Sequence, residues 1–256
     1  MPSSGLSNNS PSVGLATRAW LGRLSQEGML LDRQSWDPIQ RALDKCRQVS
    51  PAGMVHDLAL RLGASAERAL LAGSVSELFY AACSLTDDLQ DGDTDAYLGD
   101  LPFALRLNAQ SHLLCLVAAR VRDLSLDLVA DIYRTGAAML TGQRIEISRD
   151  PWNVEAYEKV ARLSAGEQFG THLSLAAIAA GKDEAPWRQF GRAWGMLLQL
   201  VADREARDPR LLSLDEREVG DLWQRSTEDL RQASFPLGEM VQEQVKGLLE
   251  RCPAIG

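Results

Sequence analysis

The sequence lacks the clustered positive charge that nucleic-acid binding requires. It carries 27 Lys and Arg residues against 35 Asp and Glu residues, which gives a formal net charge of -8, and no long block of basic residues occurs. Because nucleic acids are bound through a clustered basic face, this balance argues against a nucleic-acid partner. A basic amphipathic helix lying on a membrane surface is not expected for the same reason.

Cysteine and histidine are also scarce, and both are scattered. The chain has no Cys-x-x-Cys pair, and its three histidines do not cluster. This spacing favours reduced, structural thiols over a disulfide framework or a zinc site. The four cysteines are Cys46, Cys83, Cys115 and Cys252.

Targeting and membrane signals are missing as well. Residues 1–13 are polar and rich in Gly, Ser and Pro, without the charged start and apolar core of a secretory signal. They predict a disordered tail and a cytoplasmic protein. No uninterrupted apolar run approaches the roughly 18 residues that a membrane span needs, so none is expected.

Strand signals are nearly absent, whereas helical patterns fill the chain. Apolar residues recur at three- and four-residue spacing in segments rich in Ala, Leu, Arg, Gln and Glu. Long helices without a heptad repeat predict one all-α domain over 14–256, an orthogonal bundle of about ten long helices around a central cavity. The predicted helices cover 14–25, 36–47, 53–62, 66–91, 101–121, 124–148, 153–181, 185–207, 215–230 and 236–250.

The stretch SLTDDLQDGDTD (residues 84–95) places five aspartates within nine positions. Asp87 and Asp91 lie one turn apart on a single helix face, with Asp88 beside them. Because a helix C-terminus already carries partial negative charge, a bound divalent cation would relieve their repulsion. Mg²⁺ fits best, since it takes one or two carboxylates together with substrate phosphate oxygens. Asp88→Ala should abolish turnover by an enzyme of this kind and leave stability nearly unchanged or raise it, since it relieves repulsion; a large loss of stability would count against a metal site.

Three other interpretations of the aspartates compete with magnesium. A solvated helix end followed by a charged loop is the simplest of them. A calcium-binding EF-hand is rejected, because counting from Asp91 puts Ala96 and Pro102 where the loop needs Gly and Glu. A ferritin-like di-iron site would need Glu-x-x-His pairs, and the sequence has none.

The stretch ELFYAACSLTDDLQDGD (residues 77–93) resembles the first aspartate-rich motif of trans-isoprenyl diphosphate synthases, the polyprenyl synthetase family. The resemblance implies an isoprenoid synthase type I-like fold, usually a homodimer. It also implies that the catalytic aspartates of this motif hold an allylic prenyl diphosphate through Mg²⁺; they are Asp87, Asp88 and Asp91. The apolar residues before the motif would line the substrate cavity, or else pack in an ordinary core; they are Leu78, Phe79 and Ala82.

Further segments match in the same order, over roughly residues 35 to 240. MLTGQRIEI resembles the family's Gly-Gln segment, which gives Gly142 and Gln143. FGRAWGMLLQLVADREARD resembles the segment that carries the second aspartate motif, and SFPL resembles the Thr-Leu-Pro-Leu that follows it. The resemblance implies that Gln143 and Gln199 bind substrate and that Asp203 is a metal ligand facing the first motif.

The second motif departs from the family pattern. Asp203 alone remains of its three acidic positions, and Glu205 should face outward because it lies about 160° round the helix. Arg204 and Arg207 add positive charge where metal ions would bind.

Cationic ligands for diphosphate are also lost. The Lys of the family's Lys-Thr-Gly is replaced by Ser164, and the early Gly-Lys-x-x-Arg segment has no clear counterpart. Arg106 is the one basic residue near the first motif, where it could bind substrate. Condensation with isopentenyl diphosphate by this chain alone is therefore doubtful.

Three functions follow from the pattern. The first is a Mg²⁺-dependent prenyltransferase acting on an allylic prenyl diphosphate, whose acceptor is isopentenyl diphosphate or another group such as a peptide side chain. The alternative is a non-catalytic subunit or regulator, forming a heteromer with a complete prenyl synthase. The third is a lyase like a class I terpene cyclase, although the usual second metal motif of such enzymes is not found.

Overall fold

The computed structural model describes residues 11–26, 33–47, 49–149 and 151–250, and its regular structure over these residues is entirely helical. The all-α prediction is therefore confirmed. The helices are α1 (Pro11–Gln26), α2 (Arg33–Cys46), α3 (Ala52–Arg61), α4 (Ala66–Asp91), α5 (Asp95–Leu98), α6 (Phe103–Leu124), α7 (Asp127–Ser148), α8 (Val154–Ala161), α9 (Glu167–Ala179), α10 (Ala185–Ala206), α11 (Pro209–Leu212), α12 (Glu216–Ser234) and α13 (Glu239–Glu250).

The bounds of α4 are those predicted from the sequence, because both ends carry strong local signals. The side chain of Ser65 accepts a hydrogen bond from the backbone N–H of Arg68 and caps the N-terminus. Gly92 ends the helix in the left-handed conformation, at φ 81°, which a residue with a side chain rarely adopts.

Other predicted bounds need correction. The segment 153–181 is not one α-helix: a π-helical stretch, η1 (Arg162–Gly166), separates α8 from α9. The short helices α5 and α11 were not predicted, because four residues are too few to show a period. A helix begins at Pro11, so the predicted tail is wrong for 11–13; residues 1–10 lie outside the described residues.

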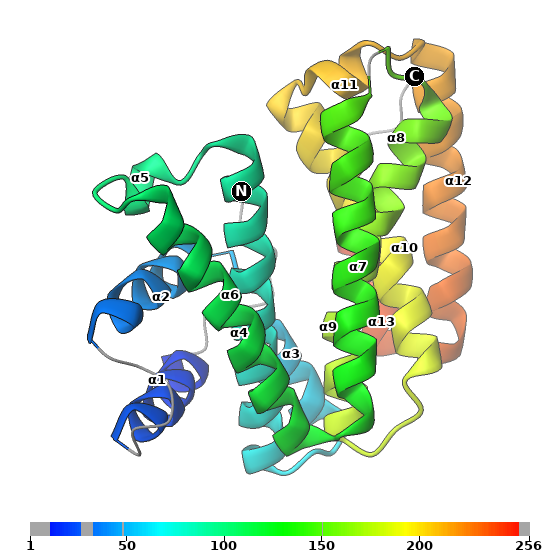
Figure 1. Ribbon diagram of the computed structural model, residues 1–256. Helices are drawn as coiled ribbons and strands as arrows, with labels where there is room; N and C mark the ends of the chain where they lie inside the picture. Colours follow the sequence, from blue (N-terminus) through cyan, green and yellow to red (C-terminus); the bar gives the residue numbers. More distant parts are fainter. Residues whose placement is uncertain (1–10, 27–32, 48, 150, 251–256) are drawn as a thin grey trace. The chain divides into compact units, whose positions relative to one another are not determined.

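The contacts divide the chain into two compact units. Unit 1 comprises residues 1–132 and 175–182, and unit 2 comprises residues 133–174 and 183–256. In unit 1, α4 packs against α1, α2, α3 and α6, so it is the central helix (Figure 1). In unit 2, α10 packs against α8, η1 and α12 (Figure 1). The single domain over 14–256 and its central cavity remain predictions.

The absence of a membrane span stays a prediction, because one helix of the described residues passes a test of length and composition alone. Helix α4 is 26 residues long and contains a window apolar enough to cross a membrane. However, 67% of that window is buried inside the protein, as in the core helix of a soluble protein, so the feature is weak evidence for a span.

Candidate functional site

The first aspartate motif lies at the C-terminal end of α4, in unit 1. Asp87 and Asp91 are exposed, and Asp88 is partly buried beside them. Because the helix ends at Gly92, all three carboxylates belong to its last two turns, where the backbone carbonyls add negative charge. The structure thus gathers the three side chains at one helix end.

Asp88 already has two partners. It forms an ion pair with Lys45 of α2 and accepts a hydrogen bond of 2.6 Å from the hydroxyl of Tyr97 in α5. The Lys45 ammonium also lies 4.9 Å from the centroid of the Tyr97 ring. Burial, together with Asp88, raises the pKa of Tyr97, so its hydroxyl stays protonated as a donor. A metal ion at Asp88 would therefore compete with Lys45.

Arg106, predicted to bind substrate, is engaged by the loop that follows the motif. Its guanidinium forms an ion pair with Asp95 and donates to the Thr94 hydroxyl at 2.7 Å and to the Leu101 carbonyl at 2.9 Å. Only 14% of the side chain is exposed. These contacts hold the turn between α4 and α6 in place, and a role in substrate binding remains a prediction.

The apolar residues before the motif are buried in the core of unit 1. Leu78 and Ala82 are fully buried, and Phe79 is 2% exposed. Their burial is what core packing requires. Their predicted role as the wall of a substrate cavity remains a prediction.

Glu77, at the start of the motif, ties α1 to α4. Its side chain is buried and accepts a hydrogen bond of 2.5 Å from the hydroxyl of Thr17, which also lies 3.1 Å from the Ser74 hydroxyl. Burial raises the pKa of Glu77. The contacts assign this acid to the helix interface.

The second motif lies at the C-terminal end of α10, in unit 2. The backbone N–H of Asp208 donates to the carbonyl of Asp203 at 2.8 Å, and Arg207 between them is left-handed, with φ 55°. This is the hydrogen bond of a Schellman motif, and it turns the chain back over the end of the helix. Asp203 is buried, whereas Glu205 is exposed, as its helical position predicted.

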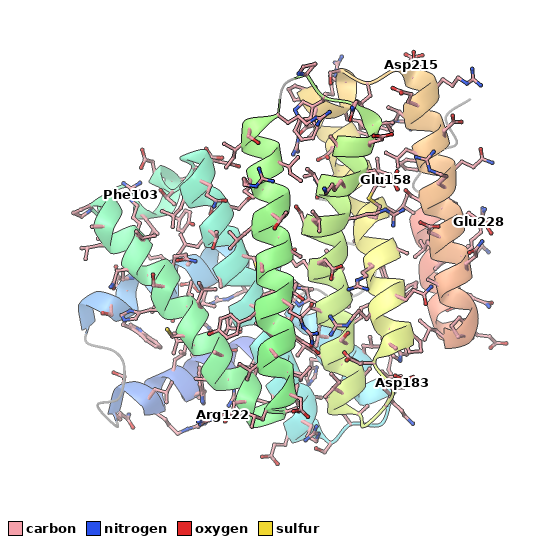
Figure 2. All side chains as sticks on the ribbon, turned by 45° about the vertical axis from the view of Figure 1, so that its right-hand side comes forward. Phe103, Arg122, Glu158, Asp183, Asp215 and Glu228 are labelled. Carbon is pink, nitrogen blue, oxygen red and sulfur yellow. The ribbon has the colours of Figure 1, made fainter. Side chains whose placement is uncertain are left out.

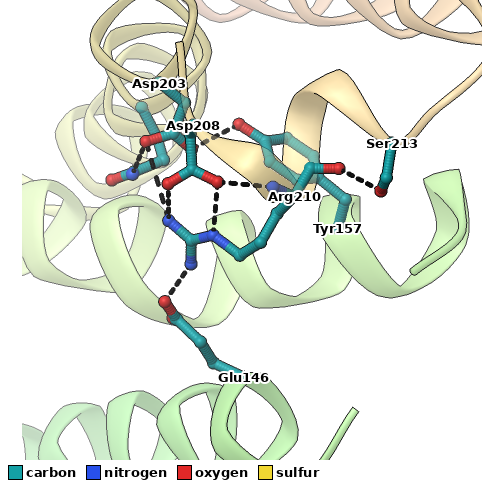
Figure 3. Close-up of polar contacts among 7 residues, drawn as sticks. Glu146, Tyr157, Asp203, Asp208, Arg210 and Ser213 are labelled. Atoms are coloured by element: carbon teal, nitrogen blue, oxygen red, sulfur yellow. Dashed lines mark hydrogen bonds and ion pairs between the residues drawn. The ribbon is translucent and has the colours of Figure 1, made fainter. Parts of the chain in front are cut away.

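The side chain of Arg210 lies among the acidic side chains at this helix end (Figure 3). Its guanidinium binds Asp208 in a bidentate manner at 2.8 and 2.9 Å and forms an ion pair with Glu146 of α7. Asp203 lies 3.8 Å from the same guanidinium. Trp152 covers it, with 5.9 Å between the Cζ atom and the ring centroid.

Asp203 has two further donors from its own unit. The Tyr157 hydroxyl donates at 2.6 Å to one carboxylate oxygen, and the Gln199 amide donates at 2.7 Å to the other. Burial raises the pKa of Asp203, whereas the hydrogen bonds from Arg210 lower the pKa of Asp208. Burial alone would lower the pKa of Arg210, but Asp208 and Glu146 raise it, so the guanidinium stays charged.

The Gly-Gln and Lys-Thr-Gly segments also belong to unit 2, where they pack closely. Gln143 is buried on α7, and a Cβ at Gly142 would lie 2.8 Å from the hydroxyl of Ser164 in η1. On the side of α10, a Cβ at Gly195 of that helix would lie 2.2 Å from the carbonyl oxygen of Ala165 in η1. The π-helical stretch therefore fits between two helices through glycine contacts.

Lys45 and Arg210 were missed from the sequence. Lys45 is 43 residues from Asp88, and no local pattern joins them. Arg210 had a local signal, since Asp208 caps α11 by accepting from the Arg210 backbone N–H at 2.8 Å, and Pro209 suits the first position of a helix. The Asp-Pro-Arg sequence therefore predicts a helix start, although it does not predict the contact with Glu146.

The two motifs differ in how they suit Mg²⁺. At the first motif the exposed carboxylates of Asp87 and Asp91 are ligands of the right kind. At the second, a guanidinium already lies among the carboxylates, so the residues do not fit a metal ion. Over the described residues, no group of three Asp, Glu, His or Cys side chains is close enough to hold one.

Comparison with known proteins identifies the fold. No protein-family model matches the sequence, and no curated protein matches it. Among solved structures, the chain is similar to an isoprenoid synthase family member from Thermotoga neapolitana, with 17% identity over 94% of this chain and 98% of the other and a TM-score of 0.74. It is also similar to a geranyltranstransferase from Thermotoga maritima, with 16% identity, 93% and 96% coverage and a TM-score of 0.69.

A third similar structure is the geranyl diphosphate synthase small subunit from Antirrhinum majus, with 16% identity, 94% and 96% coverage and a TM-score of 0.66. Identities this low show a shared fold and do not transfer an activity. The protein has the all-α fold of the prenyl diphosphate synthases.

Proposed function

We propose that this protein binds an allylic prenyl diphosphate together with Mg²⁺ at the first aspartate motif and acts as a prenyltransferase. The observation that carries the proposal is the exposure of Asp87 and Asp91 at the end of a buried helix, in a chain with the fold of prenyl diphosphate synthases. Exposed carboxylates at a negative helix end favour a bound cation.

Asp87 and Asp91 would offer carboxylates to the Mg²⁺ ion, with diphosphate oxygens and water as its other ligands, and Asp88 would join them if Lys45 gave way. When bound, Mg²⁺ would offset the negative charge of the diphosphate leaving group. Lys45 would leave Asp88 or share it with the metal, because both are cations at one carboxylate. The ammonium of Lys45 would then be available to a diphosphate oxygen.

The acceptor of the prenyl group is inferred from the two arginines near the motifs. Arg106 near the first motif and Arg210 near the second both hold carboxylates of the protein itself. This supports an acceptor other than a second diphosphate. A lyase that ionises one prenyl diphosphate needs no acceptor, so it too would not require Arg106 or Arg210 to bind a second diphosphate.

A non-catalytic subunit is the second candidate function, favoured by the ion pairs of Arg210. Arg210 already pairs with carboxylates at the second motif, so this motif would hold no metal ion for catalysis. One protein of similar fold is itself named a small subunit. Helix α6 also exposes large apolar side chains, beginning with Phe103 at 61% exposure in its first turn (Figure 2). The others on this helix are Leu105, Leu107 and Leu114. Such side chains suit a protein partner, either a second copy or a complete prenyl synthase.

Thermal denaturation with Mg²⁺ and farnesyl diphosphate tests the proposal. A ligand bound only by the folded state raises the midpoint, so we expect a rise that needs both components. Asp88→Asn should abolish the rise, whereas Asp221→Asn, at an exposed position on α12 outside both motifs, should preserve it. No rise with farnesyl or geranyl diphosphate would contradict the proposal.

Product analysis then separates the functions. Consumption of farnesyl diphosphate that requires Mg²⁺ supports an enzyme, and joint consumption of isopentenyl diphosphate identifies an ordinary prenyl synthase. A midpoint rise without turnover, together with a stable complex with a complete prenyl synthase in size-exclusion chromatography, would support the non-catalytic subunit.

A further inference from the structure

The guanidinium of Arg210 has a carboxylate partner on each of its sides. The Nε and one terminal nitrogen bind Asp208, and the other terminal nitrogen binds Glu146 (Figure 3). The nitrogen that binds Asp208 is also 3.8 Å from Asp203. Three of its five N–H donors, one on each nitrogen, are therefore taken by this protein's own acids.

This arrangement has three carboxylates around one cation in a partly buried place. Asp203 is 6% exposed, and the side chains of Asp208 and Arg210 are about one-fifth exposed, at 19% and 21%. Like charges this close repel strongly where water is limited, so they require a cation in the folded state. That cation can be a metal ion or a side chain, and here a side chain lies among them.

Residues next to Arg210 in the sequence and a covering ring hold its guanidinium among the carboxylates. Asp208 caps α11 and binds the backbone and the side chain of Arg210 together, and Trp152 covers the guanidinium. A side chain held by its own helix cap loses little further entropy on binding the carboxylates. A divalent cation from solution would have to displace it against these contacts.

We propose that Arg210 is a built-in cation that takes the place of a metal ion at the second aspartate motif. This segment then binds no divalent cation. Glu146, Asp203 and Asp208 form no metal-binding group as they stand, and we expect them to close around a metal ion only once the guanidinium between them is lost. The proposal does not depend on the function proposed above, because it concerns unit 2 and stands whether or not the first motif binds a prenyl diphosphate.

Terbium luminescence tests this directly, because Tb³⁺ binds carboxylates and is excited by nearby Trp and Tyr side chains. The experiment uses the full-length chain with Asp87→Asn, Asp88→Asn and Asp91→Asn, which removes the first motif as a source of signal. In this background the natural Arg210 should give no saturable emission. Arg210→Gln should give saturable emission, with an apparent affinity at least about tenfold above any residual binding by the parent. Excess Ca²⁺ should reverse this emission, and Trp152→Phe should weaken it, since Tyr157 beside Asp203 remains as a second sensitiser.

Arg162 provides a matched control. It also joins carboxylates of two helices, Glu158 at 2.9 Å and Asp229 at 2.9 Å, but 42% of its side chain is exposed. Figure 2 shows Glu158 on α8 in the same unit. Arg162→Gln should therefore create no terbium site, since water can screen the carboxylates that remain.

Two results would overturn the proposal. One is saturable terbium binding by the protein with Arg210 intact that disappears on Asp208→Asn, since this would show that a metal displaces the guanidinium. The other is a folded Arg210→Gln variant without terbium binding. If Arg210→Gln does not fold, Arg210→Lys replaces it, because an ammonium keeps the charge but cannot bridge two carboxylates. The proposal then requires metal ions to raise the unfolding midpoint of Arg210→Lys and to leave the midpoint of the parent unchanged.

Discussion

Asp88 accepts from two groups of the protein, the hydroxyl of Tyr97 and the ammonium of Lys45. The sequence suggested that Asp88→Ala would leave stability unchanged or raise it, by relieving repulsion. The structure reverses that expectation, since the substitution leaves the Tyr97 hydroxyl and the Lys45 ammonium without their acceptor. We expect a loss of about 1 kcal/mol in the free energy of unfolding.

Chemical denaturation of a double-mutant cycle measures this effect. Asp88→Ala and Tyr97→Phe should each destabilise the protein, and the double variant should lose less than the sum, because the two changes remove one shared hydrogen bond. Additive losses would show that the contact is absent in solution. Asp221→Ala serves as the control for removing an exposed aspartate.

At the scale of the element, close packing surrounds η1, the π-helical stretch between α8 and α9, where each backbone hydrogen bond spans one residue more than in an α-helix. Gly195 of α10 comes so close to this stretch that a Cβ would lie 2.2 Å from the carbonyl oxygen of Ala165. Backbone cannot yield as a flexible side chain does. Gly195→Ala should therefore destabilise the protein by at least about 1 to 3 kcal/mol, as overpacking does in other cores.

A second glycine offers the matched comparison for thermal denaturation. Gly220 lies inside α12, and a Cβ there would meet nothing within 4 Å. Gly220→Ala should raise stability by about 0.4 to 1 kcal/mol, because alanine favours the helix. An unchanged midpoint for Gly195→Ala would mean that the close approach of α10 to η1 does not exist.

At the scale of the whole molecule, His172 should make the stability of the protein sensitive to acid. Burial lowers the pKa of this histidine to about 3, below the ordinary value near 6.5. Since the folded pKa lies below the unfolded one, the stabilising contribution is complete above about pH 6.5 and is lost as the pH falls towards 3. The expected loss between pH 8 and pH 4 is about 3 kcal/mol.

Urea denaturation across this pH range, on the natural protein and on His172→Met, checks the contribution. The variant should lose less stability on acidification, whatever its stability at neutral pH. Glu77 and Asp203 act with the opposite sign, because burial raises their pKa values and their contribution is lost as the pH rises through the folded pKa. Parallel pH profiles for the two proteins would show that His172 is accessible to protons in the folded state.

Local signals account for what could be predicted of the fold. Helix α4 was predicted from end to end because Ser65 caps it and Gly92 stops it, and both effects act within a few residues. The interruption at η1 was not predicted, and the glycines that pack against it, on α7 and α10, come from distant parts of the sequence. Helix α11 is too short to produce a period, although Asp208 and Pro209 mark its start.

The candidate site was likewise predicted in its local features and missed in its long-range contacts. By itself, the sequence determined that the protein is helical and that Asp87, Asp88 and Asp91 gather at one helix end, because helix periodicity and caps are local properties. Only the tertiary structure decided which cation each acid meets. Lys45 reaches Asp88 across 43 residues and Arg210 reaches Glu146 across 64, and ion pairs between distant segments depend on packing that no local pattern contains.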